Sequence, residues 1–108
     1  MTPEGKVKVR VKRILEPYKP ALYAHWPVQT GFGAPTLDCV GWFFGQSFAI
    51  ETKAPGKKPT PMQLSTMRDM KAAGAKIFLI DGEKFPYLPL KQWLARTYVE
   101  RCGSQREA

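Results

Sequence analysis

Two cysteines and a single histidine are all that this 108-residue chain offers to a disulfide framework or a zinc site. Small disulfide-stabilised domains need several cysteine pairs, and a structural zinc site needs about four Cys or His ligands. The composition therefore excludes both classes, and we expect Cys39 and Cys102 to be reduced thiols. The chain also lacks any run of about eighteen apolar residues, so no membrane-spanning helix is expected.

Acidic residues are scarce as well. Nine Asp and Glu stand against seventeen Lys and Arg, which gives a formal net charge of +8. An excess of this size predicts a polyanionic partner, although an ordinary basic protein would have the same composition. Charges occur near the N-terminus, where a secretory signal would need an apolar stretch, and this favours an intracellular protein. The length predicts a single domain, residues 1–108, with a modest core.

The order of elements follows from hydrophobic period and turn residues. Thr2-Pro3-Glu4 has the cap, proline and acid of a helix start, although the alternating Val and Lys that follow also fit a strand. Thr60 and Gln63 form a capping-box pattern at the start of a second helix. We predict helices at 3–16, 61–73 and 90–102, strands at 22–26, 37–44, 47–53 and 76–80, and a frayed tail at 103–108. This order predicts an α/β fold in which helices flank a small mixed β-sheet.

The second and third strands are expected to form a hairpin. Gly45-Gln46 suits a two-residue type II′ turn, which favours Gly in its first position. Counted outward from that turn, Val40 lies opposite Glu51 and Asp38 lies opposite Lys53. Alternation along each strand then brings Asp38, Glu51 and Lys53 onto one face of the sheet.

Two carboxylates and a lysine on one face form a candidate site for phosphoryl chemistry. Mg²⁺ prefers carboxylate, carbonyl and water oxygens, and Asp38 and Glu51 would supply two of them. A bound metal can lower the pKa of its water and polarise a phosphate. Lys53 can stabilise charge that develops on that phosphate or position the attacking water. The competing interpretation is a surface ion pair between Asp38 and Lys53, which would contribute little.

The spacing of Asp38 and Ile50-Glu51-Thr52-Lys53 resembles the PD-(D/E)XK nuclease superfamily, and in particular the VRR-NUC family with its small stand-alone members from phages and prophages. The matching segments lie within residues 2–81, about three quarters of the chain. They are Thr2-Pro3-Glu4, residues 27–33, residues 53–58, Gln63 and Ala73-Gly74. One departure is visible, because the family often has Pro directly before the Asp, whereas here Pro35-Thr36-Leu37 intervenes.

The resemblance implies a restriction-endonuclease-like core and a Mg²⁺-dependent endodeoxyribonuclease, with Mn²⁺ as an alternative cofactor. It implies that Asp38, Glu51 and the backbone carbonyl of Thr52 bind the metal and that Lys53 is catalytic. It also implies a homodimer that acts on branched DNA such as four-way (Holliday) junctions. The protein would be encoded by a phage or prophage and would act in the bacterial cytoplasm or in the host cytoplasm during infection. For Gln63 it implies that the side chain orients Lys53 or a water, and for Glu4 a place near the metal. Helix capping and a favourable helix dipole, respectively, are the competing explanations.

Basic residues away from the carboxylates are candidates for contact with the DNA backbone. They are Lys6, Arg10 and Arg13 along one side of the first helix, and Lys57 and Lys58 in the loop before the second. A solvated helix face is the competing interpretation of the first group. The glycine-rich stretch 30–35 either allows a phosphate to approach the site or is a simple connection. A basic nucleic-acid-binding module without catalysis is the first alternative function, and it would be favoured by loss of an acidic or lysine position, all of which are present. A protein-interaction subunit that retains the fold is the second alternative.

Overall fold

The computed structural model describes residues 1–29 and 33–107, with side chains to residue 103. Its elements follow one another in the predicted order and confirm an α/β fold with a small mixed sheet. They are α1 (Pro3–Leu15), the 3₁₀ turn η1 (Glu16–Tyr18), β1 (Leu22–His25), β2 (Cys39–Phe43), β3 (Gln46–Thr52), α2 (Pro61–Ala72), β4 (Lys76–Ile80) and α3 (Leu88–Glu107). Within these residues no helix is both long enough and apolar enough to cross a membrane.

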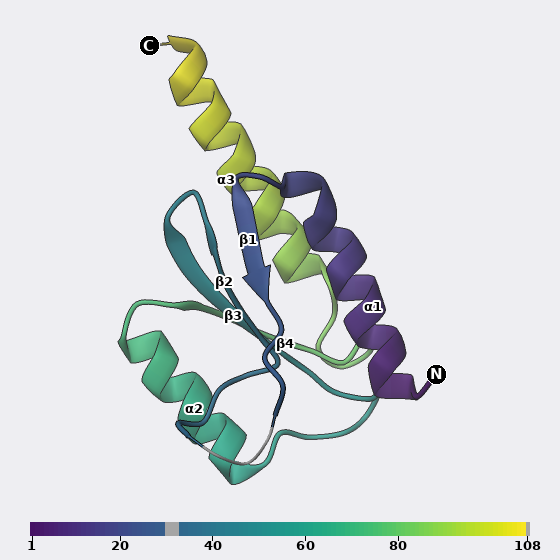
Figure 1. Ribbon diagram of the computed structural model, residues 1–108. Helices are drawn as coiled ribbons and strands as arrows, with labels where there is room; N and C mark the ends of the chain where they lie inside the picture. Colours follow the sequence, from purple (N-terminus) through teal and green to yellow (C-terminus); the bar gives the residue numbers. More distant parts are fainter. Residues whose placement is uncertain (30–32, 108) are drawn as a thin grey trace.

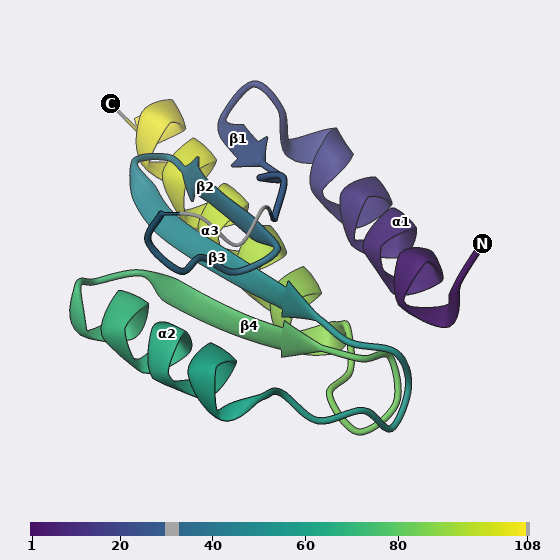
Figure 2. The same cartoon turned by 60° about the horizontal axis from the view of Figure 1, so that its bottom comes forward.

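The four strands lie in the order β1-β2-β3-β4. The first three are antiparallel neighbours, and β4 runs parallel to β3. A parallel pair needs a crossover connection, which α2 provides between β3 and β4. The α1 and α3 helices lie together against one face of the sheet, whereas α2 lies apart from them beside β4 (Figure 1, Figure 2).

The core lies between the sheet and the α1–α3 layer. Its helical side is made of Val7, Val11, Leu15, Leu90 and Leu94, all buried. Its sheet side comes from alternate residues of the strands, as the period of two requires. The half-buried Trp93 of α3 packs against this core, with its ring centroid 5.4–5.7 Å from those of three phenylalanines on β2, β3 and β4. This aromatic cluster fixes the position of α3 on the sheet.

The hairpin turn differs from the sequence-based prediction. Phe43 pairs with Gln46, so the turn residues are Phe44 and Gly45, not Gly45 and Gln46. Both have positive φ, 50° and 82°, as a type I′ turn requires. Two contacts stabilise this choice. The Phe44 ring packs 4.9 Å from that of Phe43, and the Gln46 side chain donates a hydrogen bond of 2.9 Å to the carbonyl of Gly74.

The closing helix is longer than predicted. It begins at Leu88 and continues to Glu107, so residues 103–107 are helical where the sequence indicated a frayed tail. Gly103 is the only helix-disfavouring residue in this stretch and there is no proline, so the helix can continue. Tyr98 of α3 and Leu64 of α2 are substantially exposed, at 44 % and 50 %. Within α2 the buried residue is Thr66, whereas α1 buries three residues, so α2 packs less deeply than α1.

Candidate active site

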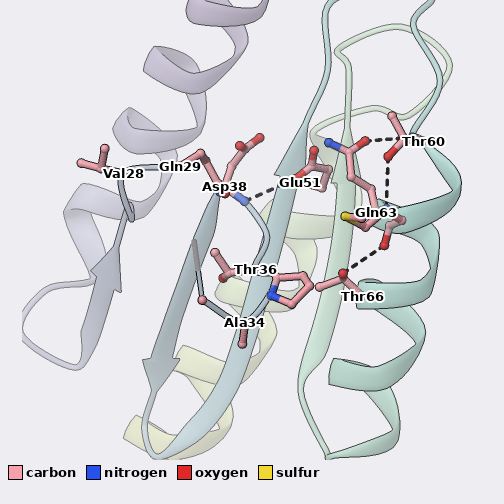
Figure 3. A pocket seen from close by; sticks show the side chains of 12 residues that line it. Val28, Gln29, Ala34, Thr36, Asp38, Glu51, Thr60, Gln63 and Thr66 are labelled. Carbon is pink, nitrogen blue, oxygen red and sulfur yellow. Dashed lines mark hydrogen bonds between the residues drawn. The ribbon is translucent and has the colours of Figure 1, made fainter. Parts of the chain in front are cut away.

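A cavity of about 480 Å³ opens where β2 and β3 meet the start of α2. Asp38 and Glu51 contribute to its lining from the sheet, and Gln63 from α2 (Figure 3). Residues 33–36 of the glycine-rich loop complete one side, whereas Thr30, Gly31 and Phe32 of that loop lie outside the described residues. The structure therefore brings three of the predicted catalytic residues to one cavity.

Asp38 lies just before β2 and is held by Thr52 at the end of β3. Its Oδ2 accepts hydrogen bonds from the Thr52 backbone N–H at 2.9 Å and from the Thr52 hydroxyl at 2.8 Å. Its Oδ1 lies 3.7 Å from the Nζ of Lys8 in α1. The hydrogen bonds at Oδ2 therefore fix the orientation of the carboxylate. Its Oδ1 faces the ammonium of Lys8, a residue that the sequence pattern did not indicate.

Glu51 is the buried member of the pair, with 2 % of its surface exposed. Its Oε1 accepts a hydrogen bond of 3.3 Å from the backbone N–H of Asp38, and its Oε2 lies 3.8 Å from the Nζ of Lys53. Burial and then the charge of Asp38 raise the pKa of Glu51 to about 7, with a smaller contribution from Glu4. Lys53 and the Asp38 N–H oppose this shift but do not cancel it.

Lys53 follows β3 directly, and its backbone N–H donates to the carbonyl of Ile80 at 2.9 Å. Its side chain is 13 % exposed, so the ammonium is confined beside Glu51. Asp38, Glu51 and Lys53 are thus neighbours, as the hairpin pattern predicted, although Asp38 lies beside Glu51 and not opposite Lys53. Thr52 holds Asp38 through two hydrogen bonds, a role that the sequence did not indicate. That its backbone carbonyl binds a metal stays a prediction.

The sequence left two explanations for Gln63, a helix cap and a role in the site, and the structure is compatible with both. The capping box with Thr60 is present, because Gln63 Oε1 accepts the Thr60 N–H at 2.9 Å and the Thr60 hydroxyl accepts the Gln63 N–H at 3.2 Å. An acceptor oxygen is needed toward the Thr60 N–H, which leaves the amide NH₂ to the other side. Figure 3 shows that this nitrogen lies on the Glu51 side. Capping and a role in the site are therefore compatible.

Glu4 lies in the first turn of α1, where Thr2 caps the helix by accepting the Gly5 N–H at 3.0 Å. Its charge raises the pKa of Glu51, which places it within electrostatic reach of the site. The residue also lies at the positive end of the helix dipole. Both explanations of Glu4 therefore have a structural basis.

The predicted DNA-binding residues do not all lie around this cavity. Lys6 and Arg10 line a second cavity of about 460 Å³, where the Arg10 guanidinium lies 4.5 Å from the Tyr87 ring centre. At 3.6 residues per turn, Lys6, Arg10 and Arg13 are roughly 140–160° around α1 from Lys8. Lys57 and Lys58 are exposed in the β3–α2 loop, and the buried Asp81 carboxylate anchors this loop by accepting the Gly56 N–H at 3.3 Å.

Three contributors escaped the sequence analysis, namely Lys8, the Thr52 hydroxyl and Asp81. Lys8 follows Glu4 by four residues, so the two share a side of α1, and this spacing was the available signal. Thr52 alternates with Glu51 along β3, so the strand pattern places it on the opposite face. Asp81 accepts N–H groups from Glu83 and Phe85, which are local contacts typical of Asp at a turn. It also accepts the N–H of Gly56, and this contact with a distant loop cannot be read from local sequence.

The donor set of the cavity fits a hard divalent cation. Among the residues that the structure describes, no three His, Cys, Asp or Glu side chains converge on one point. Mg²⁺ does not require such a set, because it keeps several waters and is commonly held by one or two carboxylates together with phosphate oxygens. Asp38 and Glu51 supply those carboxylates. Burial first, and then the charge of Asp38, raise the pKa of Glu51, and a bound cation would favour its ionised form.

Comparisons with known proteins add no identification. No family model matches the chain, and no curated protein sequence matches it.

Proposed function

We propose that this chain is a Mg²⁺-dependent endonuclease that hydrolyses DNA phosphodiester bonds. The observation that carries the proposal is that Asp38 and Glu51, joined by a hydrogen bond from the Asp38 N–H, line one cavity. The Nζ of Lys8 lies 3.7 Å from the Asp38 carboxylate, and the Nζ of Lys53 lies 3.8 Å from that of Glu51. An ionised Glu51 is unfavourable in a metal-free protein, because burial and then the charge of Asp38 raise its pKa to about 7. A bound divalent cation would offset both effects, and the two carboxylates would be its ligands.

The residues divide the work by the contacts they make. Asp38, Glu51 and the Thr52 carbonyl would hold the cation, which when bound supplies a water of lowered pKa and polarises the phosphate. Thr52 fixes the orientation of Asp38 through its N–H and hydroxyl. Lys53 places its ammonium where negative charge develops on the phosphate, and the Gln63 amide helps to orient a water or the lysine.

DNA is the proposed substrate because the net charge of +8 favours a polyanion. Branched DNA, such as a four-way junction, and a homodimer belong to the same proposal. One cation site cuts one strand, and a two-fold dimer would place two cuts symmetrically. Lys6, Arg10, Arg13, Lys57 and Lys58 would contact phosphates of the arms, and Mn²⁺ would replace Mg²⁺. The proposal places the protein inside bacterial cells and makes it phage- or prophage-encoded.

The test is incubation of the protein with linear, flapped and four-way DNA, each with Mg²⁺, Mn²⁺ or a chelator. We expect cleavage with either metal, none with chelator, and none by the Glu51→Gln protein. Sedimentation with and without the four-way DNA measures the oligomeric state. Tight DNA binding with no cleavage under any condition would contradict the enzyme and favour the non-catalytic binding module.

A further inference from the structure

Each carboxylate of the site uses one oxygen for internal hydrogen bonds and turns the other toward a lysine. For Asp38 the oxygen held by Thr52 is Oδ2, and Oδ1 faces Lys8 at 3.7 Å. For Glu51 the oxygen that accepts a backbone N–H is Oε1, and Oε2 faces Lys53 at 3.8 Å. Two ammonium groups therefore lie beside the oxygens that remain available to a cation.

The two lysines differ in their freedom to move. Lys53 directly follows β3, and its side chain is 13 % exposed. The side chain of Lys8 extends from α1 and is 36 % exposed. A lysine ammonium is a compact charge on a flexible four-carbon stem. Lys8 can therefore leave Asp38 without a change in the backbone.

We propose that Lys8 is a substrate-positioning residue of this site. It balances the charge of Asp38 while no cation is bound, and it contacts a phosphate oxygen of the DNA when a divalent cation takes Oδ1. Both positive groups favour the same oxygen, so binding of the cation displaces the ammonium toward the substrate phosphate. The proposal rests on the proposed function, since it deepens the account of how the same site holds DNA.

The first measurement is cation affinity in the absence of DNA, by calorimetric titration with Mn²⁺. Lys8→Met removes the competing charge, and we expect it to bind Mn²⁺ roughly two- to fivefold more tightly, the range that corresponds to a partly exposed ion pair. Lys12→Met is the matched control, because Lys12 lies one turn further along α1 with its Nζ 4.9 Å from the Trp26 ring centre. If Lys8→Met binds Mn²⁺ with the same affinity as the wild type and the control, the proposed displacement of Lys8 by the cation is wrong.

The second measurement is the salt dependence of DNA binding in a Lys53→Ala background, which prevents cleavage during the titration. With Mg²⁺, adding Lys8→Met should reduce the slope of log K against log salt by about 0.9, the contribution of one phosphate contact on duplex DNA. With chelator the slope should not change, because Lys8 then remains on Asp38. An unchanged slope with Mg²⁺, or an equal reduction under both conditions, would overturn the proposal.

Both measurements record binding and not turnover, so they separate this proposal from the enzymatic one. A wild-type protein that cleaves no DNA contradicts the proposed function, whatever the Lys8 results. A protein that cleaves DNA while Lys8→Met changes neither affinity nor slope contradicts only the role of Lys8. Lys8→Gln provides a second variant with a polar side chain, and its thermal unfolding establishes that the fold is intact.

Discussion

Thr52 donates two hydrogen bonds to a single oxygen of Asp38, one from its backbone N–H and one from its hydroxyl. This contact joins the end of β3 to the residue before β2 and leaves the second oxygen of Asp38 facing Lys8. Thr52 has no exposed surface, so the carboxylate is held by a group that water does not reach. The geometry of the site therefore depends on a residue that has no charge.

A Thr52→Val substitution tests this dependence, because valine keeps the branched shape and the N–H but lacks the hydroxyl. We expect the free energy of unfolding to fall by about 1 kcal/mol, the usual net value of one hydrogen bond. Cleavage should fall by about tenfold or more, because a small misplacement of a catalytic group is costly. Thr52→Ser is the control that keeps the hydroxyl. Wild-type turnover by the valine variant, measured on the best DNA substrate, would show that the N–H alone positions Asp38.

Replacing Asp38, Glu51 or Lys53 by alanine should abolish cleavage while leaving the fold intact. The two carboxylate changes should also weaken cation binding, whereas Lys53→Ala should not weaken it, because the ammonium faces Glu51 and is not a ligand. Calorimetry with Mn²⁺ and a gel assay for cleavage separate these effects. Near-normal cleavage by the Glu51→Ala protein would contradict the mechanism.

The raised pKa of Glu51 predicts a dependence of stability on pH in the cation-free protein. Its pKa is about 7 in the folded state, against an ordinary value of 4.5 for a glutamate carboxyl. Between these values the folded state binds more protons than the unfolded state, so stability falls as pH rises from 4.5 to 7. At a pH well above 7 the free energy of unfolding has fallen by about 3 kcal/mol, since each pKa unit corresponds to about 1.36 kcal/mol.

A Glu51→Gln substitution should remove that loss, since glutamine fills a similar volume and does not ionise. In denaturant unfolding with chelator, the variant should be more stable than the wild type at pH 8, and the difference should shrink toward pH 4. Saturating Mg²⁺ should stabilise only the wild type. A wild-type protein as stable at pH 8 as at pH 5 would show that the carboxylate is ionised without cost.

The hairpin shows why a wrong turn still gave the right neighbours. Side chains alternate with a period of two, so the turn at Phe44-Gly45 shifts the register by two residues and leaves the paired strand residues on their predicted faces. What alternation could not predict is the packing of α1 against the sheet, which brings Lys8 to Asp38. That packing depends on the burial of Val7, Val11 and Leu15 of α1 among core residues from distant strands, and no local pattern contains it.

Gln63 allows the capping and active-site explanations to be separated in one substitution. Gln63→Glu keeps an oxygen that can accept the Thr60 N–H, and glutamate is a standard capping-box residue, so the melting temperature should change little. The same change replaces the amide NH₂ on the Glu51 side with an acceptor and adds a negative charge near two carboxylates. We therefore expect cleavage to fall at least tenfold while α2 stays capped. Gln63→Ala, which loses both groups, is the comparison and should cost about 1 kcal/mol of stability as well as activity. Wild-type cleavage by Gln63→Glu, together with a destabilised Gln63→Ala protein, would restrict Gln63 to the cap.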